Sequence, residues 1–290
     1  SVKQLLLDQA AEVFVGTTLG PEADELAADF HATVHGGQAM IRADVPGGTW
    51  ARGLRARERL ERYFAAQIPA RRAGCGTDLF SMLCHSRGEH GERFSDTDIV
   101  NHMIFLLMAA HDTSAIAISM LVYELGRNTD WQDRLRDEAL HNANDELTLA
   151  DLDGGYPLLD AAFDEILRMY APAGTLFRQA LTDTEVAGHF IPRKSQVAIN
   201  VYASMRLADW WPDPDRFDPG RFLGGADARP VHRYAFAPFG GGVHKCLGQQ
   251  FADMNVKAVM HQVLRHFDWH VPAGYRPMMT WGTGPTPADG

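Results

Sequence analysis

The chain has 290 residues, of which 46% are hydrophobic and 22% are charged, and its formal net charge is −10. This composition is typical of a globular protein with ample material for a core, and the acidic balance argues against a general surface for nucleic acid or anionic lipid. The three cysteines make no disulfide framework, so a reducing compartment is favoured. We therefore expect a cytoplasmic protein without a nucleic-acid partner.

The first 90 residues predict helices, chiefly over 21–36 and 48–74. The second of these ranges carries Arg and Glu at three- and four-residue spacings, which is typical of a solvated helix with one apolar stripe. A shorter helical stretch around Cys84 follows. The chain therefore begins as an all-helical segment.

Residues 95–128 predict one long helix that begins with a capping box formed by Ser95 and Asp98. Its middle is apolar on all sides, so it either lies in a core or crosses a membrane. Four polar residues, 111–114, stand at its centre, and an ionised Asp there is costly in lipid. We therefore predict a core helix with a polar centre and no membrane segment in this chain.

The remaining elements mix short strands with two helices. Amphipathic helices are expected over 156–172 and 247–267, with β-like runs over 175–181, 184–192 and 195–205 and a hairpin turn near Gly188. Proline and glycine make 209–242 irregular, and a long irregular segment in a compact domain is usually functional. The expected fold class is mainly α with minor β.

The glycine-rich loop before the last helix, FAPFGGGVHKCLG, places Cys246 at a helix N-terminus. The loop lacks the Gly-Lys-Ser/Thr of a phosphate loop, and His244 stands where a nucleophile elbow needs Gly. No convincing second ligand at close spacing supports zinc. A thiolate favoured by the helix dipole, on a backbone that approaches something flat, suits a proximal haem iron ligand.

At these residues the sequence resembles the cytochrome P450 family of haem-thiolate monooxygenases, whose signature Phe-x-x-Gly-x-x-x-Cys-x-Gly is matched by Phe239, Gly242, Cys246 and Gly248. The resemblance implies that Cys246 is the axial ligand of haem b and that Phe239 packs near the sulfur. It also implies that His244 reaches a haem propionate. The loop glycines, Gly240 among them, let the backbone approach the cofactor.

A second match is Glu165-x-x-Arg168, which shares one helix face and can form an ion pair. Alone this pattern is weak, because most such pairs are solvated. The family adds an arginine from Pro-x-Arg-Phe, which here is Arg221. The resemblance implies a structural triad that pins the irregular 209–242 segment to the core.

A third match lies at the centre of the long helix, where Ala109, Ala110, Asp112 and Thr113 follow the family pattern Ala/Gly-Gly-x-Asp/Glu-Thr. The resemblance implies that Asp112 and Thr113 relay protons to bound dioxygen, and that the two small residues leave room beside the haem. Thr113 is also expected to bond back to the Ala109 carbonyl. Ala110 replaces the usual Gly and tightens this pocket.

A fourth match is Arg178. The resemblance implies that its side chain reaches a haem propionate. The segment before it, including Ala173, Gly174 and Leu176, is expected to line the substrate pocket together with Ala109 and Thr113.

The resemblance covers almost the whole chain, as the C-terminal two-thirds of the P450 fold, with a long central helix over the haem, an irregular meander and a Cys-ligand loop. We expect one domain over 1–290 that is incomplete at its N-terminus and clipped at its C-terminus. The resemblance leaves open whether a membrane anchor precedes Ser1.

The implied reaction inserts one atom of O2 into an apolar small molecule of the sterol, terpenoid or fatty-acid-like classes. Electrons come from an external ferredoxin or flavoprotein reductase, for which Lys245 and Lys257 are candidate docking residues. A peroxygenase or isomerase of the same fold is one alternative, although members of that kind typically lack the Asp-Thr pair. The other alternative is a truncated, non-catalytic relic that retains no haem.

Overall fold

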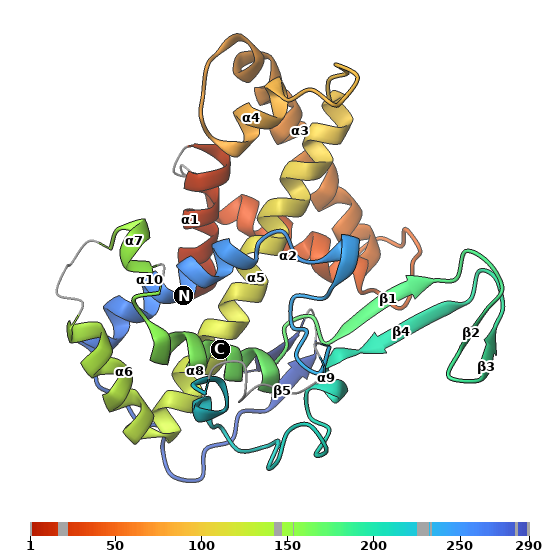
Figure 1. Ribbon diagram of the computed structural model, residues 1–290. Helices are drawn as coiled ribbons and strands as arrows, with labels where there is room; N and C mark the ends of the chain where they lie inside the picture. The colour runs from red at the N-terminus through yellow and green to blue at the C-terminus, as the bar shows by residue number, and fades with distance from the viewer. Residues whose placement is uncertain are drawn as a thin grey trace. The chain divides into compact units, whose positions relative to one another are not determined.

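The computed structural model describes residues 2–16, 23–141, 147–152, 154–224, 232, 234–281 and 284–288. Helices dominate, and three small antiparallel sheets accompany them, as Figure 1 shows. The mainly α fold class with minor β is therefore confirmed. The chain forms two compact units, 1–115 and 116–290, and each is described by itself. The expectation of a single domain stays a prediction.

The described residues of unit 1 form helices, with one isolated β-bridge between Arg87 and Arg93. Unit 1 contains α1 (Val2–Val15), α2 (Ala23–Gly37), α3 (Thr49–Ala73), α4 (Leu79–His85) and the N-terminal part of α5 (Asp96–Arg127). The predicted helices over 21–36 and 48–74 are confirmed to within two residues. Apolar side chains at helical spacing form its core, with members Leu7, Ala10, Phe30, Leu60, Phe64, Phe80, Met103 and Leu107.

Helices α2 and α3 approach most closely through two glycines. A Cβ placed on Gly53 would lie 2.7 Å from the Gly36 Cα and 3.0 Å from the Ala32 carbonyl oxygen. A Cβ on Gly36 would lie 2.8 Å from the Gly53 Cα. Both clashes are with backbone, which cannot rotate away as a side chain can, so the crossing requires glycine at both positions.

The long helix α5 begins with the predicted capping box. The Ser95 Oγ accepts from the Asp98 N–H at 3.1 Å, and the Asp98 carboxylate accepts from the Ser95 hydroxyl at 2.7 Å. By length and composition α5 could cross a membrane, but 59% of its most apolar window is buried within the structure. Such burial is characteristic of a core helix, which meets the same criteria of length and composition.

Unit 2 contains the rest of the helices. They are α6 (Thr129–His141), α7 (Leu149–Leu152), α8 (Pro157–Met169), α9 (Val201–Ser204) and α10 (Gln249–His266), together with the 3-10 turns η1 (Pro219–Phe222) and η3 (Gly242–His244). Helix α8 ends three residues before Pro172, because Tyr170 already closes the last turn by donating to the Ile166 carbonyl. The expected stop at Pro172 is therefore corrected to Met169.

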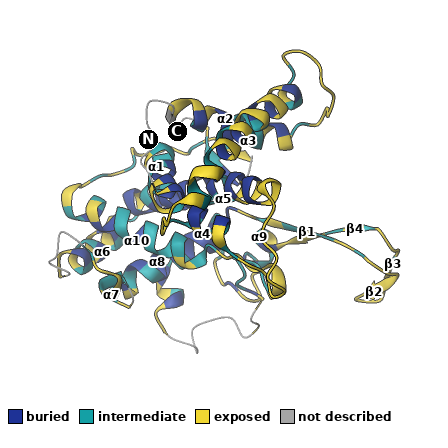
Figure 2. Ribbon diagram, turned by 90° about the horizontal axis from the view of Figure 1, so that it is seen from above, coloured by how far each residue is buried: buried dark blue, intermediate teal, exposed yellow. Residues whose placement is uncertain are grey.

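Three two-stranded antiparallel sheets complete unit 2. They pair β1 (Thr175–Gln179) with β4 (Gln196–Asn200), β2 (Thr184–Val186) with β3 (His189–Ile191), and β5 (Met279–Trp281) with β6 (Pro285–Pro287). The predicted hairpin is confirmed, with φ +52° at Ala187 and +81° at Gly188. The expected β-like run 195–205 ends at Asn200, whose side chain accepts from the Ala203 N–H and starts α9. Figure 2 shows that the β1–β4 and β2–β3 ribbons are largely exposed.

The segment 209–242 has no α-helix or strand among its described residues, and 225–231 and 233 lie outside them. Its described part is held by aromatic packing. Trp211 is 2% exposed, its ring lies tilted against Phe222 with centroids 5.8 Å apart, and its indole N–H donates to the Ala235 carbonyl. The predicted irregular segment therefore has no α-helix or strand in the part described, and it includes the short 3-10 helix η1.

We expect Gly53→Ala to destabilise the protein. The methyl group would meet backbone at 2.7 Å, and such overpacking costs about 1–3 kcal/mol. This cost exceeds the gain of up to about 1 kcal/mol in helix propensity. Urea unfolding measures the difference. Gly37→Ala is the matched control, since a Cβ there meets nothing within 4 Å; equal stability of the two variants would contradict the close crossing.

Candidate functional site

The loop before α10 is shaped by two glycines with left-handed backbone. Gly240 has φ +71° and Gly242 has φ +69°, a region that side chains disfavour. The Cys246 N–H donates to the Phe239 carbonyl at 2.9 Å, and the Lys245 N–H donates to the Gly242 carbonyl at 3.1 Å. These bonds fold 239–246 back on itself and leave the Cys246 thiol exposed at its end.

The Cys246 sulfur lies at the start of an 18-residue helix. Gly248 is the N-cap of α10, and a Cβ placed on it would lie 3.9 Å from the Cys246 Sγ. Helix N-termini present unpaired N–H groups and the positive end of the dipole, which favour an anion. The loop therefore presents the Cys246 thiol at the N-terminus of α10.

Aliphatic residues on both sides of Cys246 in the sequence are exposed. Val243 and Leu247 are each 96% exposed. From β1, the Leu176 Cδ1 lies 3.5 Å from the position of a Cβ on Gly240. A thiol between exposed aliphatic side chains, over a backbone without Cβ atoms, fits a flat apolar group such as a haem.

Glu165 and Arg168, both on α8, form a buried ion pair. The Arg168 Nε and Nη2 donate to the two Glu165 carboxylate oxygens at 2.7 and 3.0 Å, and both side chains are 0% exposed. The Arg221 Nε lies 3.4 Å from the same carboxylate. The structure therefore brings the three predicted triad residues together.

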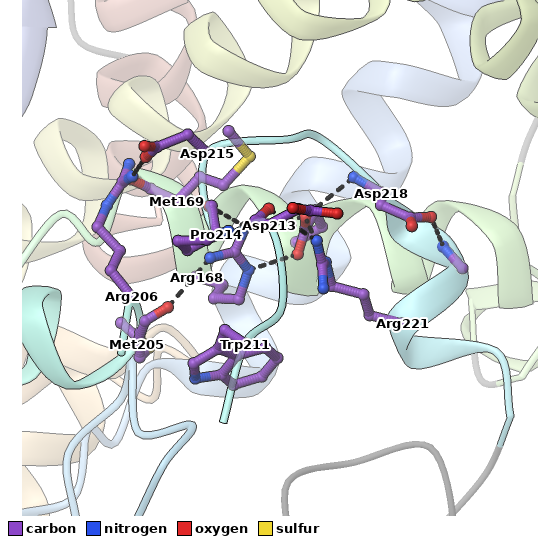
Figure 3. Close-up of polar contacts among 12 residues, drawn as sticks. Arg168, Met169, Met205, Arg206, Trp211, Asp213, Pro214, Asp215, Asp218 and Arg221 are labelled. Carbon is purple, nitrogen blue, oxygen red and sulfur yellow. Dashed lines mark hydrogen bonds and ion pairs between the residues drawn. The ribbon is translucent and has the colours of Figure 1, made fainter. Parts of the chain in front are cut away.

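Further bonds extend this triad along the irregular segment (Figure 3). Arg168 also donates to the Met205 carbonyl at 3.0 Å and to the Pro214 carbonyl at 2.8 Å. The Asp218 N–H donates to Glu165 at 2.9 Å. Because one buried carboxylate and one guanidinium reach all these backbone groups, they fix the path of the chain before the cysteine loop.

In unit 1, the predicted bond from the Thr113 hydroxyl to the Ala109 carbonyl is confirmed at 2.9 Å. Asp112 is buried, at 7% exposure, and its Oδ1 lies 2.8 Å from the Lys3 Nζ. Lys3 belongs to α1. The polar centre of α5 thus contains a back-bonded hydroxyl beside a carboxylate in an ion pair.

One stripe of α5 is exposed although the helix is apolar. Phe105 is 61% exposed, Ala109 is exposed and Thr113 is half-buried, and these positions repeat every four residues along one face. Ala110 instead packs against the core of unit 1. The expectation that Ala109 and Ala110 leave room beside a haem stays a prediction.

The other predicted residues of unit 2 lie near the surface. The Arg178 Nη1 donates to the Phe177 carbonyl at 2.8 Å, and His244 is exposed in η3. Ala173 is exposed, while Gly174 and Leu176 are half-buried. Their roles at a haem and a substrate pocket stay predictions.

The expected docking role of Lys257 is wrong, whereas Lys245 is exposed and stays a candidate. Lys257 is 5% exposed, and its Nζ lies 2.7 Å from Asp160 and 2.9 Å from Asp253. Although burial alone lowers the pKa of Lys257, these carboxylates outweigh it and raise that pKa. Lys257 therefore joins α10 to α8 instead of meeting a partner.

Sequence reasoning missed Lys3 and the backbone partners of the triad. The carbonyls of Met205 and Pro214 and the Asp218 N–H carry no side-chain signal, so no pattern could reveal them. Lys3 has one weak signal, its position four residues before the buried Leu7 on the core-facing stripe of α1.

Comparisons with known proteins agree on one fold. A sequence profile of the cytochrome P450 family matches residues 53–284. The structure of retinoic acid bound cyanobacterial CYP120A1 matches with a TM-score of 0.89 and 28% identity, covering 99% of this chain and 66% of that one. The expected P450 fold is therefore confirmed.

Two curated relatives show how far the similarity extends. Putative cytochrome P450 136 of Mycobacterium tuberculosis (strain ATCC 25618 / H37Rv) is 40% identical over 294 residues, covering 100% of this chain and 60% of that protein. Lanosterol 14-alpha demethylase of Rattus norvegicus is 28% identical over 295 residues, covering 98% of this chain and 58% of that protein. The chain belongs to the cytochrome P450 family, and it spans about 60% of the length of these relatives.

We expect Arg168→Leu to destabilise unit 2 by about 3–5 kcal/mol, because it leaves a fully buried carboxylate without its main partner. Arg216→Leu is the matched control. Arg216 pairs with Asp218, and the Arg216 side chain is 68% exposed. Such solvated ion pairs contribute about 0–1 kcal/mol to the free energy of unfolding. Urea unfolding compares the two variants, and similar midpoints would contradict the importance of the buried pair.

Proposed function

We propose that the chain is the haem-thiolate part of a monooxygenase that inserts one atom of O2 into an apolar small molecule. The supporting observation is the Cys246 thiol, which lies at the start of α10 and is flanked by two aliphatic side chains that are 96% exposed. A thiolate in such a place has no structural partner among the described residues, and it suits the axial ligation of iron.

The proposed cofactor is haem b, which when bound supplies the dioxygen chemistry and accepts the electrons. Cys246 would ligate the iron through its sulfur. Phe239, Gly240, Gly242 and Gly248 would let the backbone approach the cofactor face around that sulfur. Arg178 and His244, both near the surface, would pair with the propionates; their side chains carry donors suited to carboxylates.

Asp112 and Thr113 would hold and move protons. The Thr113 hydroxyl donates to the Ala109 carbonyl, so its oxygen keeps its lone pairs for a further donor. The buried Asp112 carboxylate is the neighbouring group that can exchange a proton. This pair favours a monooxygenase over the alternative of a peroxygenase or isomerase, which needs no proton delivery to dioxygen.

The substrate class is proposed from the residues that the resemblance assigns to substrate contacts and from the relatives. Ala109, Thr113, Ala173, Gly174 and Leu176 offer small and apolar surfaces with one hydroxyl, which suits an apolar molecule. One matched protein is named lanosterol 14-alpha demethylase, and the matched structure of CYP120A1 is described as bound to retinoic acid. A sterol- or terpenoid-like substrate is therefore preferred, with a fatty-acid-like one next.

Electrons are proposed to come from a ferredoxin or a flavoprotein reductase in the cytoplasm. The exposed Lys245 lies next to the ligand residue, where an acidic partner would approach the cofactor edge most closely. Its charge would steer association in a salt-dependent way.

We expect the reduced, haem-loaded protein to give a strongly red-shifted Soret band with carbon monoxide. Cys246→Ala should abolish this band, because no other described thiol lies in the loop, while the exposed Cys75→Ala should retain it. Optical spectra measure both. A band that survives Cys246→Ala would overturn the proposed ligand.

The same spectra address the remaining alternative, a non-catalytic fragment. Haem uptake by the whole protein that contains this chain, together with none by residues 1–290 alone, would show that the chain is one part of the haem site. No uptake by either would contradict the monooxygenase proposal.

A further inference from the structure

Glu124, near the C-terminal end of α5 in unit 2, is a buried carboxylate that the proposed reaction does not use. Its exposed fraction is 1%. The Tyr170 hydroxyl donates to its Oε1 at 2.6 Å, whereas the Arg127 guanidinium and the Asn128 side-chain amide lie at 3.3 Å. A buried carboxylate requires such donors, and the shortest of these bonds joins α5 to the residue that ends α8.

Tyr170 is the donor of this bond. Burial raises the pKa of the Tyr170 phenol, and the neighbouring Glu124 carboxylate raises that pKa further, so the phenol keeps its proton at neutral pH. Tyr170 is also the C-cap of α8, where its backbone N–H donates to the Ile166 carbonyl at 2.7 Å. The hydroxyl of Tyr170 therefore fixes the point at which the chain leaves α8.

The residues that follow Tyr170 have closely packed backbone. A Cβ placed on Gly284, which precedes β6, would lie 2.5 Å from the Pro172 carbonyl oxygen and 2.8 Å from the Pro172 Cα. Backbone atoms cannot rotate away from such a contact. Pro172 is also buried, so the chain directly after α8 is held against Gly284.

A second contact holds the chain two residues further on. The Tyr202 N–H donates to the Gly174 carbonyl at 3.0 Å, and a Cβ placed on Gly174 would lie 3.1 Å from the Tyr202 Cβ. Between the two contacts Ala173 is exposed. The backbone is therefore fixed on both sides of Ala173, and this side chain is presented outward.

We propose that Glu124 and Tyr170 are positioning residues for the substrate, because their hydrogen bond sets where the chain leaves α8 and hence where Ala173 stands. This inference rests on the proposed function, in which Ala173 and Gly174 contact an apolar molecule. Neither Glu124 nor Tyr170 touches that molecule. Without their bond the segment 171–174 samples other positions, and only a fraction of the molecules is ready to bind.

Hydrogen exchange tests the positioning without haem. Tyr170→Phe should speed exchange of the amides in 171–176 about ten-fold, because local opening becomes easier. Tyr156→Phe is the matched control, since Tyr156 is the N-cap of α8 and its hydroxyl lies 2.8 Å from the buried His261 Nδ1. Unchanged exchange in Tyr170→Phe, or an equal increase in Tyr156→Phe, would overturn the inference.

Variants of the carboxylate show whether the two residues act together. Glu124→Gln should keep slow exchange, because its amide oxygen can still accept from the Tyr170 hydroxyl. Glu124→Ala should speed exchange as Tyr170→Phe does, and the double variant should be no faster than either single one. Additive effects in the double variant would contradict a shared role.

Ligand binding by the haem-loaded whole protein gives the second test. The probes are imidazole, which is too small to reach the segment after α8, and clotrimazole, which is bulky and apolar. Tyr170→Phe should raise the Kd of clotrimazole about ten-fold, as expected when only about a tenth of the molecules is ready to bind. The Kd of imidazole should not change. An equal change for both probes would show a general loss of the haem site and overturn the inference.

The outcomes separate this inference from the proposed function. If the unmodified protein takes up no haem, the proposed function fails and the inference falls with it. If it takes up haem and binds both probes, but Tyr170→Phe leaves the Kd of clotrimazole unchanged, the proposed function stands and the inference alone fails.

Discussion

The structure of unit 2 depends on one carboxylate that has no contact with water. Glu165 is 0% exposed and is compensated by Arg168, Arg221 and the Asp218 N–H. A buried charge of this kind is tolerated only while its partners remain, since removing one leaves the full desolvation cost. The same guanidinium holds the Met205 and Pro214 carbonyls, so a segment with almost no regular structure follows a fixed path to the cysteine loop.

The sequence predicts those parts of the fold in which local pattern and burial agree. Helices α3 and α10 repeat apolar residues at helical spacing, and the β2–β3 hairpin has its glycine at the turn. Helix α6 was not predicted, because one of its three buried positions is Gln132, which donates to the Leu125 and Trp269 carbonyls. A polar residue satisfied by distant backbone breaks the apolar stripe that a sequence reader would follow.

The candidate site also contains residues that local sequence pattern reveals and residues whose partners lie far away in the sequence. Cys246 and the glycines around it are contiguous, so their chemistry can be recognised from their spacing. The back-bond of Thr113 is equally local. Lys3 and Lys257 could not be interpreted in this way, because the sequence does not show that each lies next to a carboxylate on another helix. Sequence reasoning therefore overlooked Lys3 and wrongly assigned Lys257 to a docking surface.

The β1–β4 ribbon has a consequence for the handling of the chain. Among the described strands β1 pairs with β4 alone, so each strand has an outer edge of unpaired N–H and C=O groups. Phe177 at 68% and Ile199 at 45% exposure lie beside these edges. Such ribbons are marginal alone and accept a further strand from any chain that offers one. The open edges of this ribbon therefore favour self-association of residues 1–290 in concentrated solution, and the net charge of −10 opposes it.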